Sequence, residues 1–307
     1  MELLQLEYFL RVARSGNVSQ TAAEINVAQS SVSRSIARLE ESLGFPLFER
    51  VGRKIVLNEY GRMYYPYVER AFQALHDGKR CVDEFISHES HELSFSVPIS
   101  RIVREPLVRF LSDHRDIHVR QYCLPDLSRV REALEQGEID FALTYQPVDH
   151  VNFRWQPLLT EHFYFLTHRN HRLSGRKSVS LRELDGERVV MNESDDPDLL
   201  IHACERVGAH LDIVFCGNEL EGLGSMVEDG IGCSFIPAFS QYERNLHMPE
   251  WKRQLVSVLR IDDEWFSRTL GALTVKHRYM PDATRDFYKG LQHYYSVIAP
   301  ELENLDR

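Results

Sequence analysis

The feature that most constrains the fold of this chain is a change of pattern near residue 90. Before it, apolar residues recur with helical spacing and one short hairpin interrupts them; after it, strand-like stretches alternate with amphipathic helical ones. Such alternation predicts a doubly wound α/β domain behind a smaller, mainly helical domain. The strand-like stretches are 93–99, 117–124, 139–145, 162–168, 188–192, 212–216 and 232–237, and the helical ones are 106–114, 127–138, 219–230 and 280–298.

The composition is that of a globular protein. The 307 residues are 43% hydrophobic and 27% charged, which is enough for two or three domains with their own cores. No apolar run approaches the roughly 18 residues of a membrane span, and the stretch MELLQLEYFLRVARSG has no secretory cleavage site. The five cysteines form no CxxC pair. We therefore expect a cytoplasmic protein with free thiols and no membrane segment.

The net charge of −10 is unevenly distributed along the chain. Residues 1–90 hold 11 of the 36 basic residues and 12 of the 46 acidic ones, so nearly all of the negative excess lies in the remainder. Between positions 30 and 62, basic residues outnumber acidic ones. Because local charge governs contact with phosphates, the acidic total does not exclude a nucleic-acid partner for the N-terminal part.

The segment 27–44, VAQSSVSRSIARLEESLG, predicts a helix with two different faces. One face is an apolar stripe at helical spacing, made of Val32, Ile36, Leu39 and Leu43. Serines and arginines occupy the other face, and these residue types hydrogen-bond phosphates and base edges. The alternative is an ordinary solvated face. The polar face consists of Ser30, Ser31, Ser33, Arg34, Ala37 and Arg38.

The surroundings of this helix predict a winged helix-turn-helix. A first helix ends near Gly16, and Ser19 is a candidate N-cap for a short second helix over 20–25. A hairpin follows, with strands at 47–49 and 54–57. A basic hairpin tip suits a wing that lies along a phosphate backbone. The tip carries Arg50, Arg53 and Lys54.

A long helix is predicted over 59–90, with Asn58 as its candidate N-cap. Its apolar residues alternate by four and three, which is typical of a dimerising coiled coil. The alternative is an ordinary helix packed on its own domain. The seam consists of Tyr64, Val68, Ala71, Leu75, Gly78, Val82 and Phe85.

Residues 6–61 contain a set of positions in a recognisable order and spacing: Phe9, Ala22, Ala23, Gln29, Ser33, Leu39, Glu40, Gly44, Leu47, Phe48, Arg50 and Gly61. In this pattern the segment resembles the winged helix-turn-helix of the LysR-type transcriptional regulators. Ala28 departs from the family, which often has a serine there to cap the recognition helix. Val18 replaces a usual phenylalanine and Asn58 a usual threonine. None of these departures removes a DNA-contacting group.

The C-terminal part resembles the effector domain of the same family in the stretches GEIDFAL and MVEDGIGCSFIP. That domain is related in fold to the type 2 periplasmic binding proteins, with two doubly wound α/β subdomains joined by crossing strands. The resemblance implies the following domains: a winged helix-turn-helix over 1–58, a linker and dimerisation helix over 59–90, and an effector-binding domain over 91–307, with subdomain I at 92–161 and 268–301 and subdomain II at 162–267.

The resemblance implies a sequence-specific, DNA-binding transcriptional regulator that is not an enzyme and needs no cofactor. It would be a homodimer through the linker helix, paired again into a tetramer, on a pseudo-palindromic promoter site. RNA polymerase is a further candidate partner. By motif position, Gln29, Ser33 and Arg34 would face bases or phosphates, and Arg50 and Arg53 would hold the DNA backbone. The helical projection and the charge add Ser30, Ser31, Arg38 and Lys54.

The family's layout implies a ligand in the cleft between the subdomains, at the carboxyl ends of strands. Arg101 suits a carboxylate, and helix N-termini in such clefts favour anions, so we expect a small anionic metabolite that modulates the regulator. The alternative for each candidate residue is a solvated loop group. The candidates are Ser100, Arg101, Thr144, Asn192 and Glu219.

Other chemistries fit the sequence less well. Some relatives sense peroxide through a cysteine pair, and Cys204 falls at its second position, but Asp195 stands at the first. His162, His168 and His171 lie close together in a stretch that reads more simply as a strand and its exit loop than as a metal site. GxSxG, P-loop and GxGxxG motifs do not occur. A solute-binding protein, or an α/β enzyme with an oligomerising N-terminal module, is the alternative class.

Overall fold

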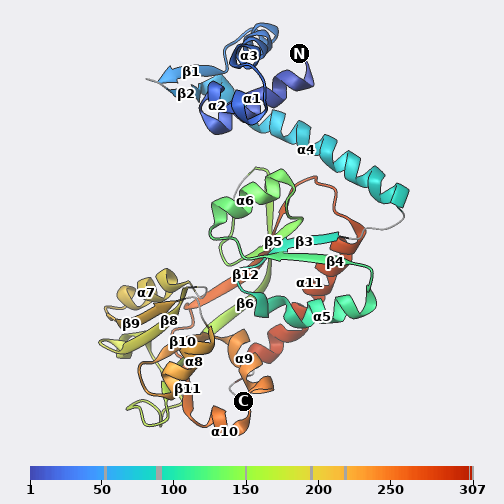
Figure 1. The fold of residues 1–307 in the computed structure, drawn as a ribbon. Helices are drawn as coiled ribbons and strands as arrows, with labels where there is room; N and C mark the ends of the chain where they lie inside the picture. The colour runs from blue at the N-terminus through green and yellow to red at the C-terminus, as the bar shows by residue number, and fades with distance from the viewer. Residues whose placement is uncertain are drawn as a thin grey trace. The chain divides into compact units, whose positions relative to one another are not determined.

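A computed structural model of the chain describes residues 1–51, 54–87, 92–148, 151–193, 196–217, 220–303 and 305. The chain forms two compact units, Met1–His88 and Glu89–Arg307 (Figure 1). Across the described ranges, no helix combines the length and the apolar character that a membrane span requires.

The first unit is helical, with a two-stranded antiparallel hairpin. Its first helix ends at Gly16, whose φ of 62° lies in the left-handed region, and the Gly16 N–H donates to the carbonyl of Val12. The predicted end of this helix is therefore confirmed. The elements of the unit are α1 (Leu3–Ser15), α2 (Val18–Glu24), α3 (Gln29–Leu43), β1 (Phe48–Val51), β2 (Lys54–Leu57) and α4 (Glu59–Ser87).

The N-caps of the first unit correct one prediction and confirm another. Asn17, not Ser19, caps α2, because its Oδ1 accepts the N–H groups of Ser19 and Gln20 at 2.9 and 3.2 Å. The helix therefore begins at Val18, and Ser19 lies inside its first turn. Asn58 caps α4 as predicted, with its Oδ1 accepting the N–H of Gly61 at 2.8 Å.

The first half of α4 completes the core of the first unit. Val68 is buried, and Tyr64 is half-buried, in the same cluster as the fully buried Phe9. This part of the predicted seam therefore packs on its own unit, as the alternative interpretation requires. The seam continues with exposed residues, and the side chain of Phe85 lies outside the described residues. The exposed seam positions are Ala71, Leu75, Gly78 and Val82.

The second unit is built on a mixed sheet in the order β4-β3-β5-β12-β6-β11-β7, with β10 also paired to β6 and with β8 and β9 forming a parallel pair (Figure 1). Strand β3 runs parallel to β4 and β5, while β12 runs antiparallel to β5 and β6. The strands are β3 (Glu92–Ser96), β4 (His118–Tyr122), β5 (Phe141–Thr144), β6 (Phe153–His168), β7 (Ser178–Val179), β8 (Arg188–Asn192), β9 (Asp212–Gly217), β10 (Ser234–Pro237), β11 (Val256–Ile261) and β12 (Ser267–Val275).

Helices cover this sheet, and separate apolar clusters lie in its two halves. One cluster contains Phe95, Phe141 and Phe287, and another contains Phe163 and Phe165. The helices are α5 (Arg104–Asp113), α6 (Leu127–Gln136), α7 (Pro197–Arg206), α8 (Leu220–Glu228), α9 (Ala238–His247), α10 (Glu250–Arg253) and α11 (Asp282–Glu303), with short 3₁₀ helices at Ser100–Val103 (η1) and Leu181–Leu184 (η2).

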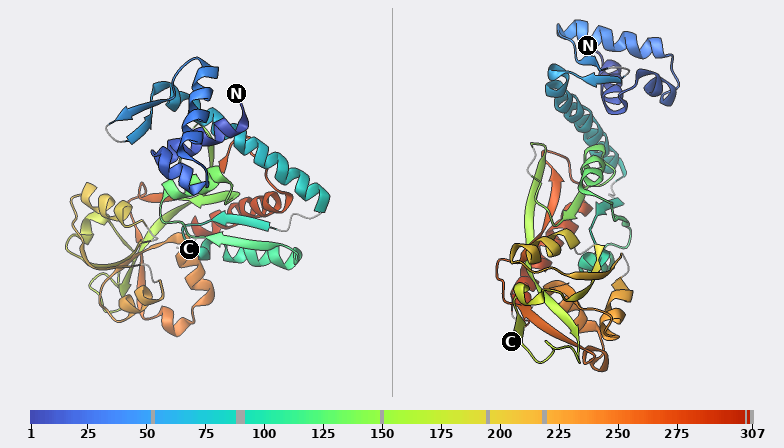
Figure 2. Two further views of the ribbon diagram at one scale, coloured as in Figure 1. Left: turned by 45° about the horizontal axis from the view of Figure 1, so that its top comes forward. Right: turned by 90° about the vertical axis from the view of Figure 1, so that its left-hand side faces the viewer.

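Strand β6 joins the two halves because it changes partners along its length (Figures 1 and 2). Its residues 153–162 pair with β12, and its residues 163–168 pair with β10 and β11. At this change Glu161 and Arg268 form an ion pair of 2.8 Å between side chains that are 2% and 3% exposed. Glu161 also accepts the N–H of Phe239, in the first turn of α9, at 2.9 Å. A buried carboxylate thus ties both crossing strands and α9 together.

Candidate functional site

Helix α3 presents the polar face that the sequence predicts. Val32, Ile36 and Leu39 are buried against the rest of the unit, and the opposite side is solvent-exposed, so the projection into two faces is confirmed. Gln29 Nε2 donates to Ser33 Oγ at 3.0 Å, which links two neighbours on the polar face. Ala28 stands at the N-cap position of α3, and its methyl side chain makes no capping hydrogen bond. The exposed polar residues are Gln29, Ser30, Ser31, Arg34 and Arg38, with Ser33 half-buried.

The hairpin places a second set of basic groups on the same unit. Strands β1 and β2 pair in antiparallel register, with Arg50 opposite Ile55. The side chains of Arg50 and Lys54 are exposed, and Arg53 lies outside the described residues. Beside β2, a groove of about 610 Å³ is lined by Lys54 and by groups near the α1–α2 turn, including Asn17. Basic and hydrogen-bonding groups of this kind suit a phosphate backbone.

Two of the residues predicted to bind an effector lie in η1, shortly after strand β3. They are Ser100 and Arg101, and the exposed Ser100 accepts a hydrogen bond from Gln121 Nε2 at 2.6 Å. Arg101 is half-buried. Both residues therefore follow the first strand of the second unit, as the sequence predicts.

Two further candidates lie at the ends of strands. Thr144 ends β5 and accepts from Trp155 Nε1 at 3.0 Å. Asn192 ends β8 and is 3% exposed. The last candidate, Glu219, lies outside the described residues. The described candidates are thus distributed over three segments of the second unit.

A cavity of about 440 Å³ lies between η1 and the helices α8 and α9. Arg101 lines it, whereas Ser100, Thr144 and Asn192 are not among its lining residues. A volume of this size is within the range of small-molecule sites. The apolar wall of the cavity, contributed by β6, α8, β10 and β11, consists of Leu166, Leu223, Val227, Phe235, Ile236 and Val256.

The carboxylates at this cavity already have cationic partners. Glu243 lies 2.9 Å from Arg104, and Glu228 lies 3.6 Å from Lys252. Arg244 also lines the cavity, and within the described part of the chain no carboxylate oxygen lies within 4.0 Å of its guanidinium. Burial lowers the pKa of Arg244, because its charge is partly withdrawn from water. The negative charge of Glu228 acts on Arg244 in the opposite direction, and the lining as a whole holds three arginines and two glutamates.

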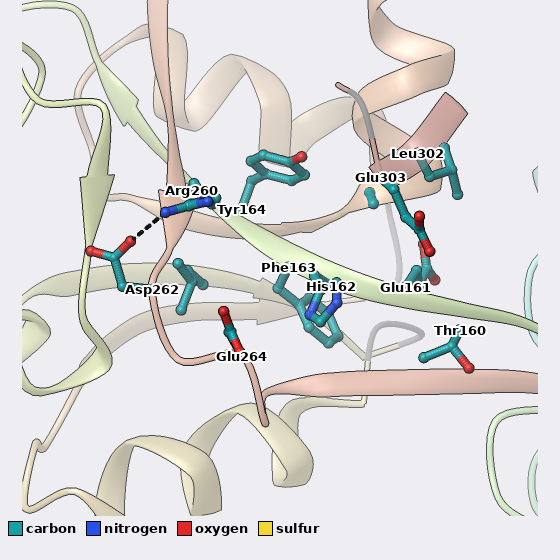
Figure 3. A pocket seen from close by; sticks show the side chains of 12 residues that line it. Thr160, Glu161, His162, Phe163, Tyr164, Arg260, Asp262, Glu264, Leu302 and Glu303 are labelled. Atoms are coloured by element: carbon teal, nitrogen blue, oxygen red, sulfur yellow. Dashed lines mark hydrogen bonds and ion pairs between the residues drawn. The ribbon is translucent and has the colours of Figure 1, made fainter. Parts of the chain in front are cut away.

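A second cavity, of about 390 Å³, lies where β6 crosses between the halves (Figure 3). Its lining includes Glu161, which is bound to Arg268, and Arg260, which is paired with Asp262 at 3.2 Å. The dashed line in Figure 3 marks this second pair. The cavity does not suit an anion, because the acidic groups that remain at its wall are Glu264 and Glu303.

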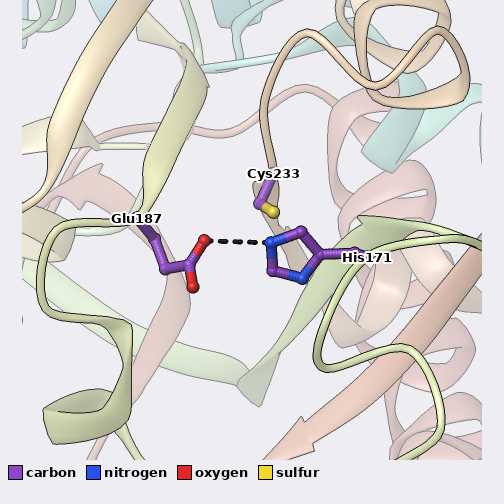
Figure 4. A group of neighbouring side chains, drawn as sticks. All are labelled: His171, Glu187 and Cys233. Atoms are coloured by element: carbon purple, nitrogen blue, oxygen red, sulfur yellow. Dashed lines mark hydrogen bonds and ion pairs between the residues drawn. The ribbon is translucent and has the colours of Figure 1, made fainter.

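One group of side chains has the residue types of a metal site (Figure 4). Ligand atoms of His171, Glu187 and Cys233 all lie within 4.8 Å of one another. However, Glu187 already accepts from Arg172 and bonds His171 Nε2, and His171 Nδ1 accepts the N–H of Leu173 at 3.3 Å. His171 Nε2 lies 3.0 Å from Glu187 Oε2, so a proton on Nε2 is donated to the carboxylate. His171 and Glu187 thus already have hydrogen-bond partners, and Cys233 is buried beside them.

The other sites considered from the sequence are not assembled in the described part of the chain. Neither His162 nor His168 belongs to the group around His171, so the three histidines do not come together. Cys204 is buried, and burial raises its pKa to about 12, while Asp195 lies outside the described residues. A thiol with a raised pKa is a poor nucleophile.

Comparisons with known proteins agree with this architecture. Residues 3–62 match the model of the bacterial regulatory helix-turn-helix protein, lysR family, and residues 87–295 match that of the LysR substrate binding domain. The chain therefore belongs to the LysR family of DNA-binding transcriptional regulators with a substrate-binding domain. Since the members of this family are regulators, the chain is not an enzyme.

Individual relatives match nearly the whole chain. The transcriptional dual regulator GltC of Bacillus subtilis (strain 168) is 28% identical over 306 residues, which cover 97% of this chain and 99% of GltC. A full-length CbnR complexed with its target DNA has a TM-score of 0.53 at 22% identity, covering 96% of this chain and all of that one. A hydrogen peroxide-bound mutant of OxyR from Corynebacterium glutamicum has a TM-score of 0.55 at 19% identity, covering 99% and 97%. The two solved structures support the fold.

Proposed function

We propose that the first unit binds double-stranded DNA at specific sequences, with α3 as the recognition helix in the major groove. The observation that carries this proposal is the exposed polar face of α3 opposite a buried apolar stripe. Short hydroxyls allow close approach, and arginine pairs with guanine. The proposed DNA contacts are Gln29, Ser30, Ser31, Ser33, Arg34 and Arg38 on the helix and Arg50, Arg53 and Lys54 on the wing.

The protein acts as a homodimer through the exposed second half of α4, and two dimers pair into a tetramer. Two-fold symmetry then calls for a pseudo-palindromic promoter site with half-sites one helical turn or a multiple of it apart. The regulator works in the cytoplasm, where RNA polymerase is a further partner. The proposed domains are 1–58 for DNA binding, 59–90 for dimerisation and 91–307 for effector binding, the last divided into 92–161 with 268–301 and 162–267.

A small anionic metabolite modulates this activity from a site between the two α/β subdomains. The support is the position of the candidate residues at the ends of β5 and β8 and in η1, just after β3, which is where α/β sheets bind ligands. Effector binding would shift the angle between DNA-binding dimers. The residues proposed for this site are Ser100, Arg101, Thr144, Asn192 and Glu219.

A genomic selection with the purified protein, followed by footprinting at two salt concentrations, tests the regulator function. Recovery of a few dyad-symmetric sites is the expected result, and the adjacent genes would point to the metabolite. Recovery of nothing above background, with and without pools of central metabolites, would instead favour an N-terminal module that only oligomerises the chain.

The division of labour within the DNA-binding surface gives a further prediction. Replacing Arg34 by alanine will relax base preference at one position of each half-site, at a cost of about 1–3 kcal/mol on the preferred sequence. Replacing Arg53 by alanine will weaken binding to all sequences and reduce the salt dependence by about one unit of slope. Binding titrations on matched and mismatched sites at several salt concentrations separate the two effects. Equal losses for both variants on every sequence would contradict the assignment.

A further inference from the structure

Glu40 lies in the second half of α3, and its carboxylate holds the start of the wing, the hairpin of β1 and β2. Its Oε1 atom accepts the backbone N–H groups of Leu47 and Phe48 at 2.7 and 3.2 Å. We propose that Glu40 is a positioning residue, which fixes the wing relative to the recognition helix so that both meet the same DNA duplex. This role rests on the proposed DNA-binding function and adds to it a residue that does not itself touch DNA.

The contact between Glu40 and the wing is well suited to hold the backbone in place. A carboxylate that accepts N–H groups forms charge-assisted hydrogen bonds, which are about twice as strong as neutral ones. Leu47 is fully buried and Glu40 is half-buried, so water has little access to these groups. A buried N–H group that loses its acceptor is costly. The start of β1 is therefore expected to move together with α3.

Two further contacts hold the wing on its other sides. The backbone N–H of Asn58, the N-cap of α4, donates to the carbonyl of Leu47 at 3.0 Å. On the second strand, the N–H of Ile55 donates to the carbonyl of Gly16 at 3.3 Å. These contacts tie the wing to α4 and to the α1–α2 turn. Of the three hydrogen-bonded contacts, the one made by Glu40 reaches the recognition helix.

The basic groups of the wing follow closely in the chain. Arg50 lies two residues after Phe48, and its side chain is exposed. Lys54, also exposed, is paired with Val51 across the hairpin. A basic group of the wing adds to affinity only if it reaches a phosphate while α3 occupies the major groove, and a preorganised surface binds more tightly than a mobile one. Fixing the start of β1 against α3 therefore fixes where Arg50 and Lys54 meet the DNA backbone.

Loss of the Glu40 carboxylate should have an effect opposite in sign to that of its charge. Removing an acidic group from a DNA-binding unit ordinarily strengthens binding, because phosphates are repelled less. Glu40→Ala in the full chain should instead weaken binding to a fluorescently labelled duplex of random sequence about tenfold or more, and reduce the salt dependence by about one to two units of slope, because the wing loses phosphate contacts. Glu40→Gln keeps a side-chain carbonyl as acceptor and should recover most of the affinity.

The matched control is Glu41→Ala, which removes the exposed carboxylate next along the helix. This variant should bind the duplex as tightly as the parent chain or more tightly. Equal losses in Glu40→Ala and Glu41→Ala, or a Glu40→Ala variant that binds as well as the parent, would overturn the proposal.

A double-mutant cycle separates positioning from a general loss of structure. The variant Arg50→Ala/Arg53→Ala/Lys54→Ala removes every basic residue of segment 48–57, so Glu40 has no charged group left to place there. Adding Glu40→Ala to this variant should weaken duplex binding by less than about twofold, because the two sets of changes act through one surface. A further loss as large as in the parent chain would contradict the positioning role.

Hydrogen exchange of the full chain tests the contact in the absence of DNA. In Glu40→Ala the amide hydrogens of Leu47 and Phe48 should exchange about tenfold or more faster than in the parent, whereas those of the fully buried Phe9 and Val12 should keep the parent's rates. Unchanged exchange at Leu47 and Phe48, or equal acceleration at Phe9 and Val12, would overturn the proposal. A parent chain that binds no duplex would contradict the DNA-binding function itself, and the exchange rates then decide separately whether Glu40 fixes the wing.

Discussion

Gly61, in the first turn of α4, lies directly against the backbone of Leu47. A Cβ at this position would lie 2.0 Å from the carbonyl oxygen of Leu47, the atom that accepts the N–H of Asn58 at 3.0 Å. Gly61→Ala must therefore displace a fully buried residue and a helix-capping segment, at a cost of about 1–3 kcal/mol. Calorimetry of the full chain should show the transition of the first unit shifted to lower temperature.

Gly78 provides the control, because it lies in the same helix and a Cβ there meets nothing within 4 Å. Gly78→Ala should be neutral or stabilise the unit by up to about 1 kcal/mol through its helix propensity. If both variants destabilised the unit equally, the close approach of Gly61 to Leu47 would not be the cause.

The buried thiols of the second unit imply a loss of stability at alkaline pH. Burial raises the pKa values of Cys204 and Cys233 to about 12, whereas an unfolded thiol titrates near 8.5. The folded state therefore holds these protons more tightly than the unfolded state. The stabilisation is fully present below about pH 8.5 and is lost as the pH rises towards 12, so the free energy of unfolding should fall across this interval.

Urea titrations at several pH values measure this fall. The matched variant is Cys204→Ala/Cys233→Ala, in which the two thiol protons are absent and the fall should be smaller. The same dependence on pH in the parent chain and in the double variant would show that the thiols do not cause it.

Residue by residue, the sequence predicts which side of one helix is buried better than it predicts contacts between distant segments. The faces of α3 follow from the spacing of its apolar residues, because one helix is enough to define them. The pairing of Glu161 with Arg268 could not be predicted, since the two are distant in sequence and the register of β6 against β12 brings them together.

At the scale of elements, the crossing strands depend on their buried ion pair. Arg268→Met would leave Glu161 charged and buried without its ionic partner, which should cost about 3–5 kcal/mol. The double variant Glu161→Leu/Arg268→Met removes both charges and should recover most of that loss. Urea unfolding of the full chain, followed in the second unit, gives the comparison.

The matched control is Arg260→Met. Arg260 lies on strand β11, a neighbour of β6, and forms an exposed ion pair with Asp262. Its expected cost is at most about 1 kcal/mol. A double variant as unstable as the single Arg268→Met variant would show that the ion pair is not the source of the effect.

Elements are predicted well where one pattern dominates and missed where polar residues interrupt it. The strands β3, β5 and β8 and the helices α6 and α11 lie near their predicted positions. The segment of β12, SRTLGALTV, carries an arginine and a glycine, and its structure depends on pairing with both β5 and β6. Helix α9 is missed because its apolar face is short. Tertiary contacts decide such elements.

At the scale of the whole molecule, the exposed part of the α4 seam should control oligomer formation. Leu75 and Val82 are 54% and 55% exposed, so the double variant Leu75→Glu/Val82→Glu places charges in the proposed dimer seam and should raise the dimer dissociation constant about 100-fold or more. Analytical ultracentrifugation measures the shift. The control is Met63→Glu, because Met63 is an exposed residue of α4 outside the seam. An unchanged dimer dissociation constant in the double variant, or an equal rise in the control, would contradict this role.

The division of α4 has a consequence for how such regulators diversify. The turns around Tyr64 and Val68 belong to the fold of the DNA-binding unit, whereas the turns around Leu75 and Val82 face outward. If chains pair through these outward turns, as proposed, then changes there alter which chains recognise each other without rebuilding the unit that contacts DNA. A cell with many duplicated copies of this architecture could keep its regulators from mixing by varying a few side chains over a length of helix that folding leaves free to change.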